Sequence, residues 1–153
     1  MPTETVTLNE ARRVLRSLIS TLQDSQKGFA DVGEHLKDNT LKRYFLAESL
    51  KRANLRAELE IELRRQGDHD ANVTGSAAGT MHRVWGDFKA KLGGGDQTLL
   101  ETAEQGEDVA KAAYKDALEH ELPLPVQQLI STQQAHILTS HDHVKRARDE
   151  RKA

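Results

Sequence analysis

Four clusters of turn-forming residues divide this chain, and the stretches between them have helical periodicity. The clusters are Asp38–Thr40, Gly67–Ser76, Gly93–Asp96 and Leu122–Pro125. They predict helices over residues of about 8–36, 40–66, 77–92, 97–120 and 126–149. None of these segments alternates apolar and polar residues as a strand does. The sequence therefore predicts an all-α fold.

Local signals at the predicted helix ends agree with this division. Thr7 and Glu10 have the spacing of a capping box at the start of the first helix. Asp96 is expected to cap the helix over 97–120 with its own side chain. Pro125 suits the first turn of the last helix.

The lengths of the connections predict a topology. Tight turns join the first two and the last two long helices, so each pair is expected to form an antiparallel hairpin. About 30 residues, including the short helix over 77–92, separate the hairpins and can run back along a bundle about 40 Å long. Two hairpins joined by one long crossover are the ferritin-like arrangement. We expect a ferritin-like four-helix bundle as a single domain over residues 1–153, with a short extra helix in the crossover.

The helix over 40–66 has a second apolar face. One stripe comprises Leu41, Tyr44, Leu55 and Leu59, and the opposite stripe comprises Leu46, Leu50, Ala53, Ala57 and Ile61. The short helix has one apolar face, formed by Met81, Val84, Trp85, Phe88 and Leu92. We expect the short helix to cover the second stripe, and a dimer interface there is the alternative.

Several charged residues fall on the inward faces of the long helices. At a rise of about 1.5 Å per residue, four of them reach similar heights in the bundle: Glu48, Glu104, Glu107 and His141. Gln133 and His136 lie at the periphery of this layer. Such groups are costly to bury unless they pair, hydrogen-bond or hold a metal.

Two interpretations of the layer remain open. In the first, Glu48, Glu104, Glu107 and His141 bind a divalent metal such as iron, manganese or zinc. In the second, Glu48 pairs with Arg52 and Glu107 pairs with Lys111, each at i, i+4, while His141 hydrogen-bonds a carboxylate. The two cations beside the carboxylates favour the second interpretation.

A dinuclear carboxylate centre is disfavoured in either case. Such a centre takes a Glu from each of two helices and a Glu-x-x-His motif from each of the others. The helix over 8–36 offers no inward carboxylate, and neither Glu48–Lys51 nor Gln133–His136 completes the motif. The chain also has no cysteine nucleophile. The sequence therefore favours a protein that is not an enzyme.

Composition excludes other classes of function. A net charge of −2 provides no basic surface for nucleic acid. No apolar run approaches the roughly 18 residues of a membrane span. The absence of cysteine excludes disulfides and thiolate metal ligands. The first residues lack the basic and apolar regions of a signal peptide. We expect a cytoplasmic protein with neither nucleic-acid nor membrane partners.

Several segments together resemble a known family. They are Leu18–Asp24 with Gly28–Phe29, Gly75–Ser76 with Met81–Trp85, Glu104–Asp108 with Tyr114, and Gln133–Asp142. They resemble a bacterial ferritin-like four-helix-bundle family that is catalogued as a domain of unknown function. The likeness spans nearly the whole chain. It implies a ferritin-like bundle in a bacterial protein of unassigned activity, and it brings no catalytic residues.

Two functions follow as expectations. The first is a ferritin-like bundle that binds a divalent metal in its central carboxylate and histidine layer and takes part in stress or metal handling. The second is a structural or interaction protein whose inner layer is a salt-bridge network. Outer helix faces could then join copies into a homo-oligomer.

Overall fold

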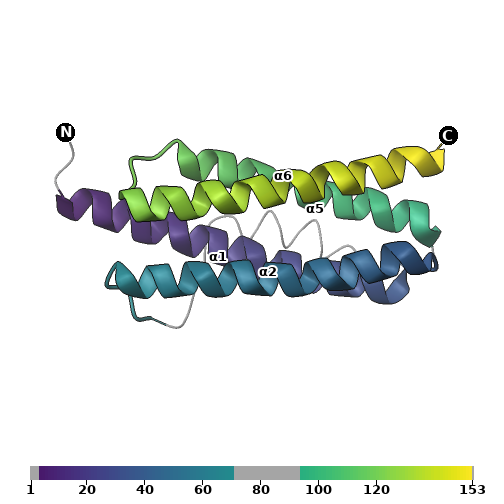
Figure 1. Ribbon diagram of the computed structural model, residues 1–153, viewed down its shortest axis with the longest axis horizontal. Coiled ribbons are helices and arrows are strands. Elements are labelled where there is room, and N and C mark those ends of the chain that lie inside the picture. The colour runs from purple at the N-terminus through teal and green to yellow at the C-terminus, as the bar shows by residue number, and fades with distance from the viewer. Residues whose placement is uncertain (1–3, 71–93, 153) are drawn as a thin grey trace.

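The computed structural model of the chain describes residues 4–70 and 94–152, and within these ranges it contains helices and no strand. The four helices are α1 (Glu4–His35), α2 (Asn39–Arg65), α5 (Gly95–Leu118) and α6 (Leu124–Lys152). They lie side by side as an elongated four-helix bundle (Figure 1). The predicted all-α class is confirmed, and each long helix ends within a few residues of its predicted bounds.

The helices form two antiparallel hairpins, α1 with α2 and α5 with α6 (Figure 1). The start of α5 lies beside the turn between α1 and α2, because the Asp96 carboxylate accepts hydrogen bonds from the backbone N–H groups of Lys37 and Asp38. At the other end of the bundle, His120 after α5 contacts Glu10 of α1. The end of α2 and the start of α5 therefore lie at opposite ends of the bundle.

Two predicted caps are wrong. The helix α1 begins at Glu4, so Thr7 lies inside it and does not start it. Asp96 lies in the first turn of α5, after the N-cap Gly94, which makes no side-chain capping bond. The Asp96 carboxylate instead accepts the two N–H groups of the neighbouring turn, because this turn packs against the start of α5. Asp38 caps α2 through Thr40 and Leu41.

A polar layer divides the apolar interior into two clusters. One cluster includes Leu15, Leu18, Leu22, Leu55, Leu59, Tyr114, Ile130 and Ile137. The other includes Phe29, Val32, Phe45, Leu99, Leu100 and Val144. The buried polar residues Ser25, Glu48, Arg52, Glu107 and Ser140 lie between the two clusters along every helix. The apolar clusters supply the hydrophobic stabilisation, and the polar layer requires its own partners.

The second apolar stripe of α2 faces outward. Leu50 is 69% exposed, and Leu46 and Ile61 are 36% and 44% exposed. The short helix expected over residues 77–92, with Trp85 at its centre, lies outside the described residues. Among the residues that the structure does describe, no helix is long and apolar enough to cross a membrane.

One bidentate ion pair holds the segment after α2 against α1. Arg16 Nε donates to Asp68 Oδ2 at 2.6 Å, and Arg16 Nη2 donates to Asp68 Oδ1 at 2.9 Å. The bond from Arg16, with a further bond from the backbone N–H of Asp70, lowers the pKa of Asp68 to about 2. This contribution to stability is present above the ordinary aspartate pKa of about 4 and is lost as the pH falls toward 2.

We therefore expect Asp68→Asn to lower the melting temperature at pH 7 and to have little effect at pH 2 and below. Because the pair is close to the surface, the loss at pH 7 should be at most about 1 kcal/mol. Thermal melts of both proteins between about pH 2 and pH 7 measure this difference. Asp116→Asn, at an exposed site on α5, is the control. A difference between Asp68→Asn and the unmodified protein that stays constant over this pH range would contradict the assignment.

Candidate functional site

Arg52 lies at the centre of the polar layer and is completely buried. Its guanidinium Nε donates to Glu48 Oε1 at 2.7 Å, and its Nη1 donates to Ser25 Oγ at 2.7 Å. Its Nη2 lies 2.7 Å from Glu107 Oε1 and donates to Ser140 Oγ at 3.0 Å. One side chain thus contacts residues of all four helices. We call these five residues the arginine cluster.

Two effects set the pKa values in the arginine cluster: the burial of its charged groups, and the guanidinium that Glu48 and Glu107 share. Burial raises the pKa of Glu48, but hydrogen bonds with His136 and Arg52 outweigh it, and the pKa of Glu48 is lowered overall. Burial also raises the pKa of Glu107, and Arg52 offsets only part of that effect. Burial by itself would lower the pKa of Arg52, but the two carboxylates raise it by more than burial lowers it. The pKa of Arg52 is therefore raised overall, and the guanidinium stays charged. The arginine therefore supplies the positive charge that these carboxylates need.

These contacts test each of the two ion pairs that were predicted for the layer. The pair of Glu48 with Arg52 is confirmed. The predicted pair of Glu107 with Lys111 is wrong, because Lys111 is exposed and Glu107 contacts Arg52 of α2 instead. A spacing of i, i+4 allows Glu107 and Lys111 to approach each other. Glu107 is buried, however, so it pairs with Arg52, the cation that is buried beside it.

The arginine cluster also packs against an aromatic pair. The Arg52 guanidinium lies over the ring of Phe29, with Cζ 4.6 Å from the ring centroid. Phe29 in turn stacks on Phe45 with ring centroids 5.0 Å apart. The face of an aromatic ring attracts a cation, and this attraction is larger where water is excluded. Phe29 therefore stabilises the position of the guanidinium from the apolar side.

The two peripheral residues of the predicted layer are also engaged. The Tyr114 hydroxyl donates to Gln133 Oε1 at 2.7 Å, and Gln133 Nε2 donates to the Leu55 carbonyl at 3.0 Å. His136 Nε2 lies 2.8 Å from Glu48 Oε1. Gln133 therefore satisfies buried polar groups of α2 and α5, and His136 adds a second partner for Glu48 at the edge of the arginine cluster.

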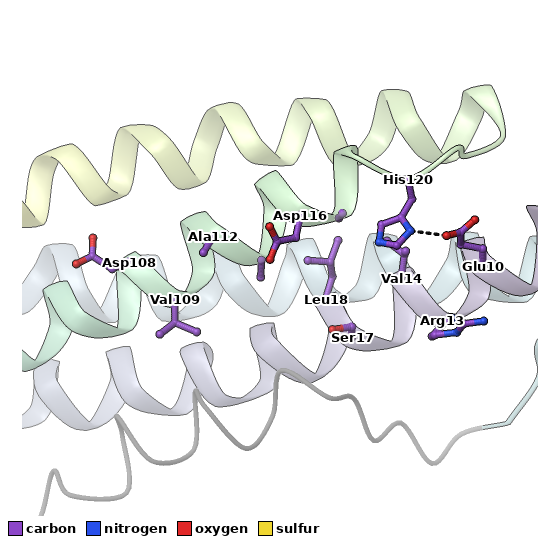
Figure 2. A pocket seen from close by; sticks show the side chains of 12 residues that line it. Glu10, Arg13, Val14, Ser17, Leu18, Asp108, Val109, Ala112, Asp116 and His120 are labelled. Carbon is purple, nitrogen blue, oxygen red and sulfur yellow. Dashed lines mark hydrogen bonds and ion pairs between the residues drawn. The ribbon is translucent and has the colours of Figure 1, made fainter.

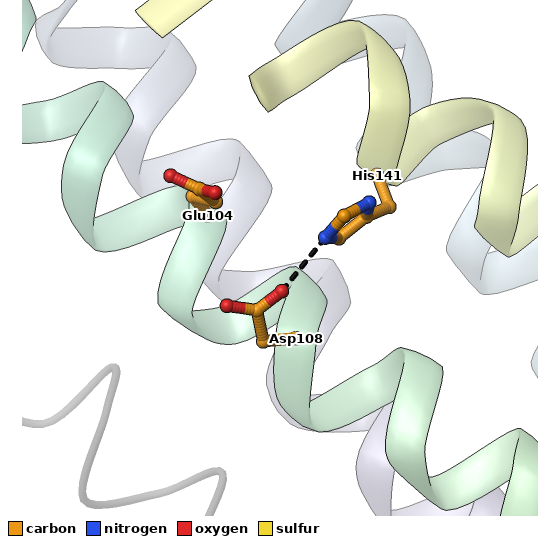
Figure 3. Close-up of side chains that lie close together, drawn as sticks. All are labelled: Glu104, Asp108 and His141. Atoms are coloured by element: carbon orange, nitrogen blue, oxygen red, sulfur yellow. Dashed lines mark hydrogen bonds and ion pairs between the residues drawn. The ribbon is translucent and has the colours of Figure 1, made fainter.

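A second group of polar residues lies between α5 and α6 and comprises Glu104, Asp108 and His141 (Figure 3). One possible ligand atom from each of the three lies within 4.8 Å of the others. His141 Nε2 is 2.7 Å from Asp108 Oδ1, and His141 Nδ1 is 3.1 Å from Asp142 Oδ1. We call Glu104, Asp108 and His141 the carboxylate–histidine triad.

The local structure of α5 and α6 explains this arrangement. Glu104 and Asp108 are four residues apart on α5, so their side chains lie on the same face, one turn apart. His141 reaches them from α6, which runs antiparallel beside α5 (Figure 1). Glu104 and His141 are buried, whereas the Asp108 side chain is 61% exposed. The triad therefore has a buried side and a side open to solvent.

The donor atoms of the triad fit a divalent metal ion. Two carboxylates and one imidazole are a ligand set suited to zinc, manganese or iron(II). Bonds of about 2.0–2.2 Å to one ion would place the ligand atoms about 3–3.5 Å apart. Atoms that lie within 4.8 Å of one another would have to approach by at most about 1–2 Å to reach that spacing. The exposure of Asp108 would leave water access to further coordination positions.

Arg148 of α6 forms an ion pair with Glu104 from the other side. Its Nε and Nη2 atoms also donate to Asp149 Oδ1, at 3.0 Å and 2.7 Å. Glu104 therefore has a cationic partner in the absence of a metal. Arg148 therefore compensates a carboxylate that is only 8% exposed.

A groove of about 630 Å³ runs between α1 and α5 (Figure 2). Its lining includes the apolar residues Val14, Leu18, Val109, Ala112 and Ala113. The ion pair of Glu10 with His120 lies at one end, and Asp108 lies at the other end (Figure 2). Asp108 therefore belongs to the groove as well as to the triad.

The structure divides the four predicted ligands between two places. Glu48 and Glu107 contact Arg52, whereas Glu104 and His141 join Asp108. Sequence analysis missed Asp108, because only inward-facing residues were considered and Asp108 is exposed. Its spacing of four residues from Glu104 was the available signal. Arg148, seven residues after His141 on the same face of α6, was missed for the same reason.

The comparisons with known proteins identify a family but no function. The family described as Domain of unknown function (DUF2383) matches residues 10–120. The match covers α2 and α5 entirely and most of α1, and it includes Glu104 and Asp108. His141 and Arg148 lie beyond it, on α6. No curated protein matches the chain.

Proposed function

The chain belongs to the DUF2383 family, whose function is unassigned, and from this starting point we propose that it is a ferritin-like bundle protein that binds one divalent transition metal. The ligands in this proposal are Glu104, Asp108 and His141. The observation that carries it is the approach of their possible ligand atoms to within 4.8 Å of one another. We place its role in metal or stress handling in the bacterial cytoplasm.

The topology supports the ferritin-like part of the proposal. The two hairpins are antiparallel, and the end of α2 and the start of α5 lie at opposite ends of the bundle (Figure 1). A bundle with one long crossover connection has this geometry.

The arginine cluster occupies the place in the core where catalytic bundles hold a dinuclear centre, so we propose a different kind of metal site for this protein. Those centres lie in the bundle core, between carboxylates of facing helices. Here the guanidinium of Arg52 lies between the core carboxylates Glu48 and Glu107. A metal at that position would have to displace a buried cation that has four partners. We therefore place the metal between α5 and α6 and propose a binding function without catalysis.

Zinc binding should stabilise the folded protein through the triad. We expect Zn²⁺ at ~100 μM to raise the melting temperature, because only the folded state presents the three ligands together. In a titration, the rise should grow with the logarithm of the Zn²⁺ concentration. Mn²⁺ should act more weakly, as the order of affinities of divalent metals predicts. The shift should shrink as the pH falls from about 7.5 to about 5.5, because binding requires an unprotonated imidazole. Thermal melts by circular dichroism measure all of these effects.

Matched variants test whether the triad holds the metal. His141→Ala and Glu104→Gln should abolish the shift produced by Zn²⁺. His143→Ala is the control, because His143 lies on the same helix but stacks on Tyr44 instead of facing the triad. This variant can change the baseline stability, but it should keep the shift. The proposal fails if Zn²⁺, Mn²⁺ and Fe²⁺ all leave the melt of the unmodified protein unchanged.

A second candidate function is that of a structural or interaction protein, which forms homo-oligomers through an outer helix face. The observation that favours it is the outward stripe of α2, where Leu46, Leu50 and Ile61 are exposed. In that case the polar groups of the bundle serve only packing and pairing. A melting temperature that does not change with any of the three metals but rises with protein concentration would favour this candidate.

A further inference from the structure

Glu104 lies between the pair of Asp108 with His141 and the guanidinium of Arg148. In the antiparallel pair of α5 and α6, His141 lies opposite Asp108, and Arg148 lies opposite Glu104. One turn, about 6 Å, separates Glu104 from Asp108 along α5, and two turns, about 10.5 Å, separate His141 from Arg148 along α6. The Glu104 carboxylate can therefore face Asp108 and His141 on one side or Arg148 on the other.

We propose that Arg148 is a built-in competitor that sets the metal affinity of the triad, an inference that rests on the proposed metal-binding function. Without a metal, Arg148 neutralises the buried carboxylate of Glu104. A divalent ion bound by Asp108, His141 and Glu104 takes over this role, and Arg148 moves away from Glu104.

The surroundings of Arg148 make this exchange possible. Its side chain is 23% exposed and belongs to the last two turns of α6. It keeps the two hydrogen bonds to the exposed Asp149 when it leaves Glu104. The departure therefore leaves no buried cation without a partner. Arg52 is different in this respect, because all of its partners are buried inside the bundle.

Competition lowers the apparent affinity by the fraction of molecules in which Glu104 is free to bind the metal. Two like charges near one carboxylate also repel, which acts in the same direction. For a partly exposed pair of this kind, removal of the arginine should strengthen metal binding about three- to tenfold. A supporting arginine that only oriented Glu104 would have the opposite effect, because loss of such a partner weakens metal binding.

The experiment uses the full chain and Zn²⁺ alone as the probe. Dissociation constants are measured by isothermal titration calorimetry for the unmodified protein, Arg148→Gln and Arg146→Gln. Arg146 is an exposed residue of the same helix, so its variant changes the net charge equally without touching Glu104. We expect Arg148→Gln to bind Zn²⁺ about three- to tenfold more tightly and Arg146→Gln to bind as the unmodified protein does.

A second measurement separates competition from a loss of structure. Metal-free Arg148→Gln should melt at a lower temperature than the unmodified protein, because Glu104 loses its partner, even though the same variant binds Zn²⁺ more tightly. An unchanged or weaker affinity in Arg148→Gln, with Zn²⁺ binding intact in the unmodified protein, would overturn the inference and leave the proposed function standing. Absence of Zn²⁺ binding in all three proteins would overturn both.

Discussion

Replacing Arg52 with methionine is expected to lower the free energy of unfolding by about 3–5 kcal/mol. Methionine fills much of the same volume, but it carries neither the charge nor the donors that Glu48, Glu107, Ser25 and Ser140 use. The two carboxylates would remain buried without a cation, and the pKa of Glu107, which burial already raises, would rise further. Urea unfolding at pH 7, followed by circular dichroism, measures the loss.

A second substitution tests whether the unpaired charge causes this loss. Glu107→Leu in the Arg52→Met background removes the carboxylate that is fully buried, so it should recover most of the stability. Glu48 retains His136 in the double variant. The control is Arg56→Met, which breaks the i, i+4 pair with Glu60 at the surface and should cost less than about 1 kcal/mol. Equal effects of Arg52→Met and Arg56→Met would contradict the importance of the arginine cluster.

Phe29→Ala is expected to cost about 3–5 kcal/mol, because it removes a completely buried ring and leaves a cavity. The same change removes the aromatic face under Arg52 and the stacking partner of Phe45. Phe29→Leu keeps most of the apolar volume and loses the cation–ring contact, so it should cost about 1–2 kcal/mol. The same urea experiments measure both variants. If alanine and leucine at this position were equally tolerated, the ring would not be part of the packed core.

Most of the fold could be predicted from the sequence because helical periodicity reports which faces are buried. Leu15, Leu18, Leu22 and Phe29 on α1 and Val126, Ile130, Ile137 and Val144 on α6 recur at helical spacing, and all are buried. The predicted cap at Asp96 failed because a capping pattern is local. A carboxylate at a helix start can serve any N–H group that packs nearby, and the turn at Lys37 and Asp38 provided two.

The candidate site could be predicted only where helix geometry alone determines the neighbours. The pair of Glu48 with Arg52 lies within one helix, and its spacing sufficed. The partner of Glu107 depended on how far the long side chain of Arg52 reaches across the bundle, which spacing along α5 does not encode. Asp108 and Arg148 lie at the edge of the interface between α5 and α6. Their contacts depend on the relative axial position of two helices, and this position follows from packing.

Arg52 has a consequence for how the bundle comes apart. Its guanidinium joins α2 to Ser25 on α1, Glu107 on α5 and Ser140 on α6, and Ser140 is 88 residues away along the chain. If the two hairpins separated, Arg52 would keep Glu48 and Ser25 of its own hairpin, but Glu107 of the other hairpin would lose the cation that it contacts. Partial opening is thus penalised, and we expect the two hairpins to unfold as one cooperative unit. Amide protons in the middle of all four helices should then exchange through the same global opening and not hairpin by hairpin.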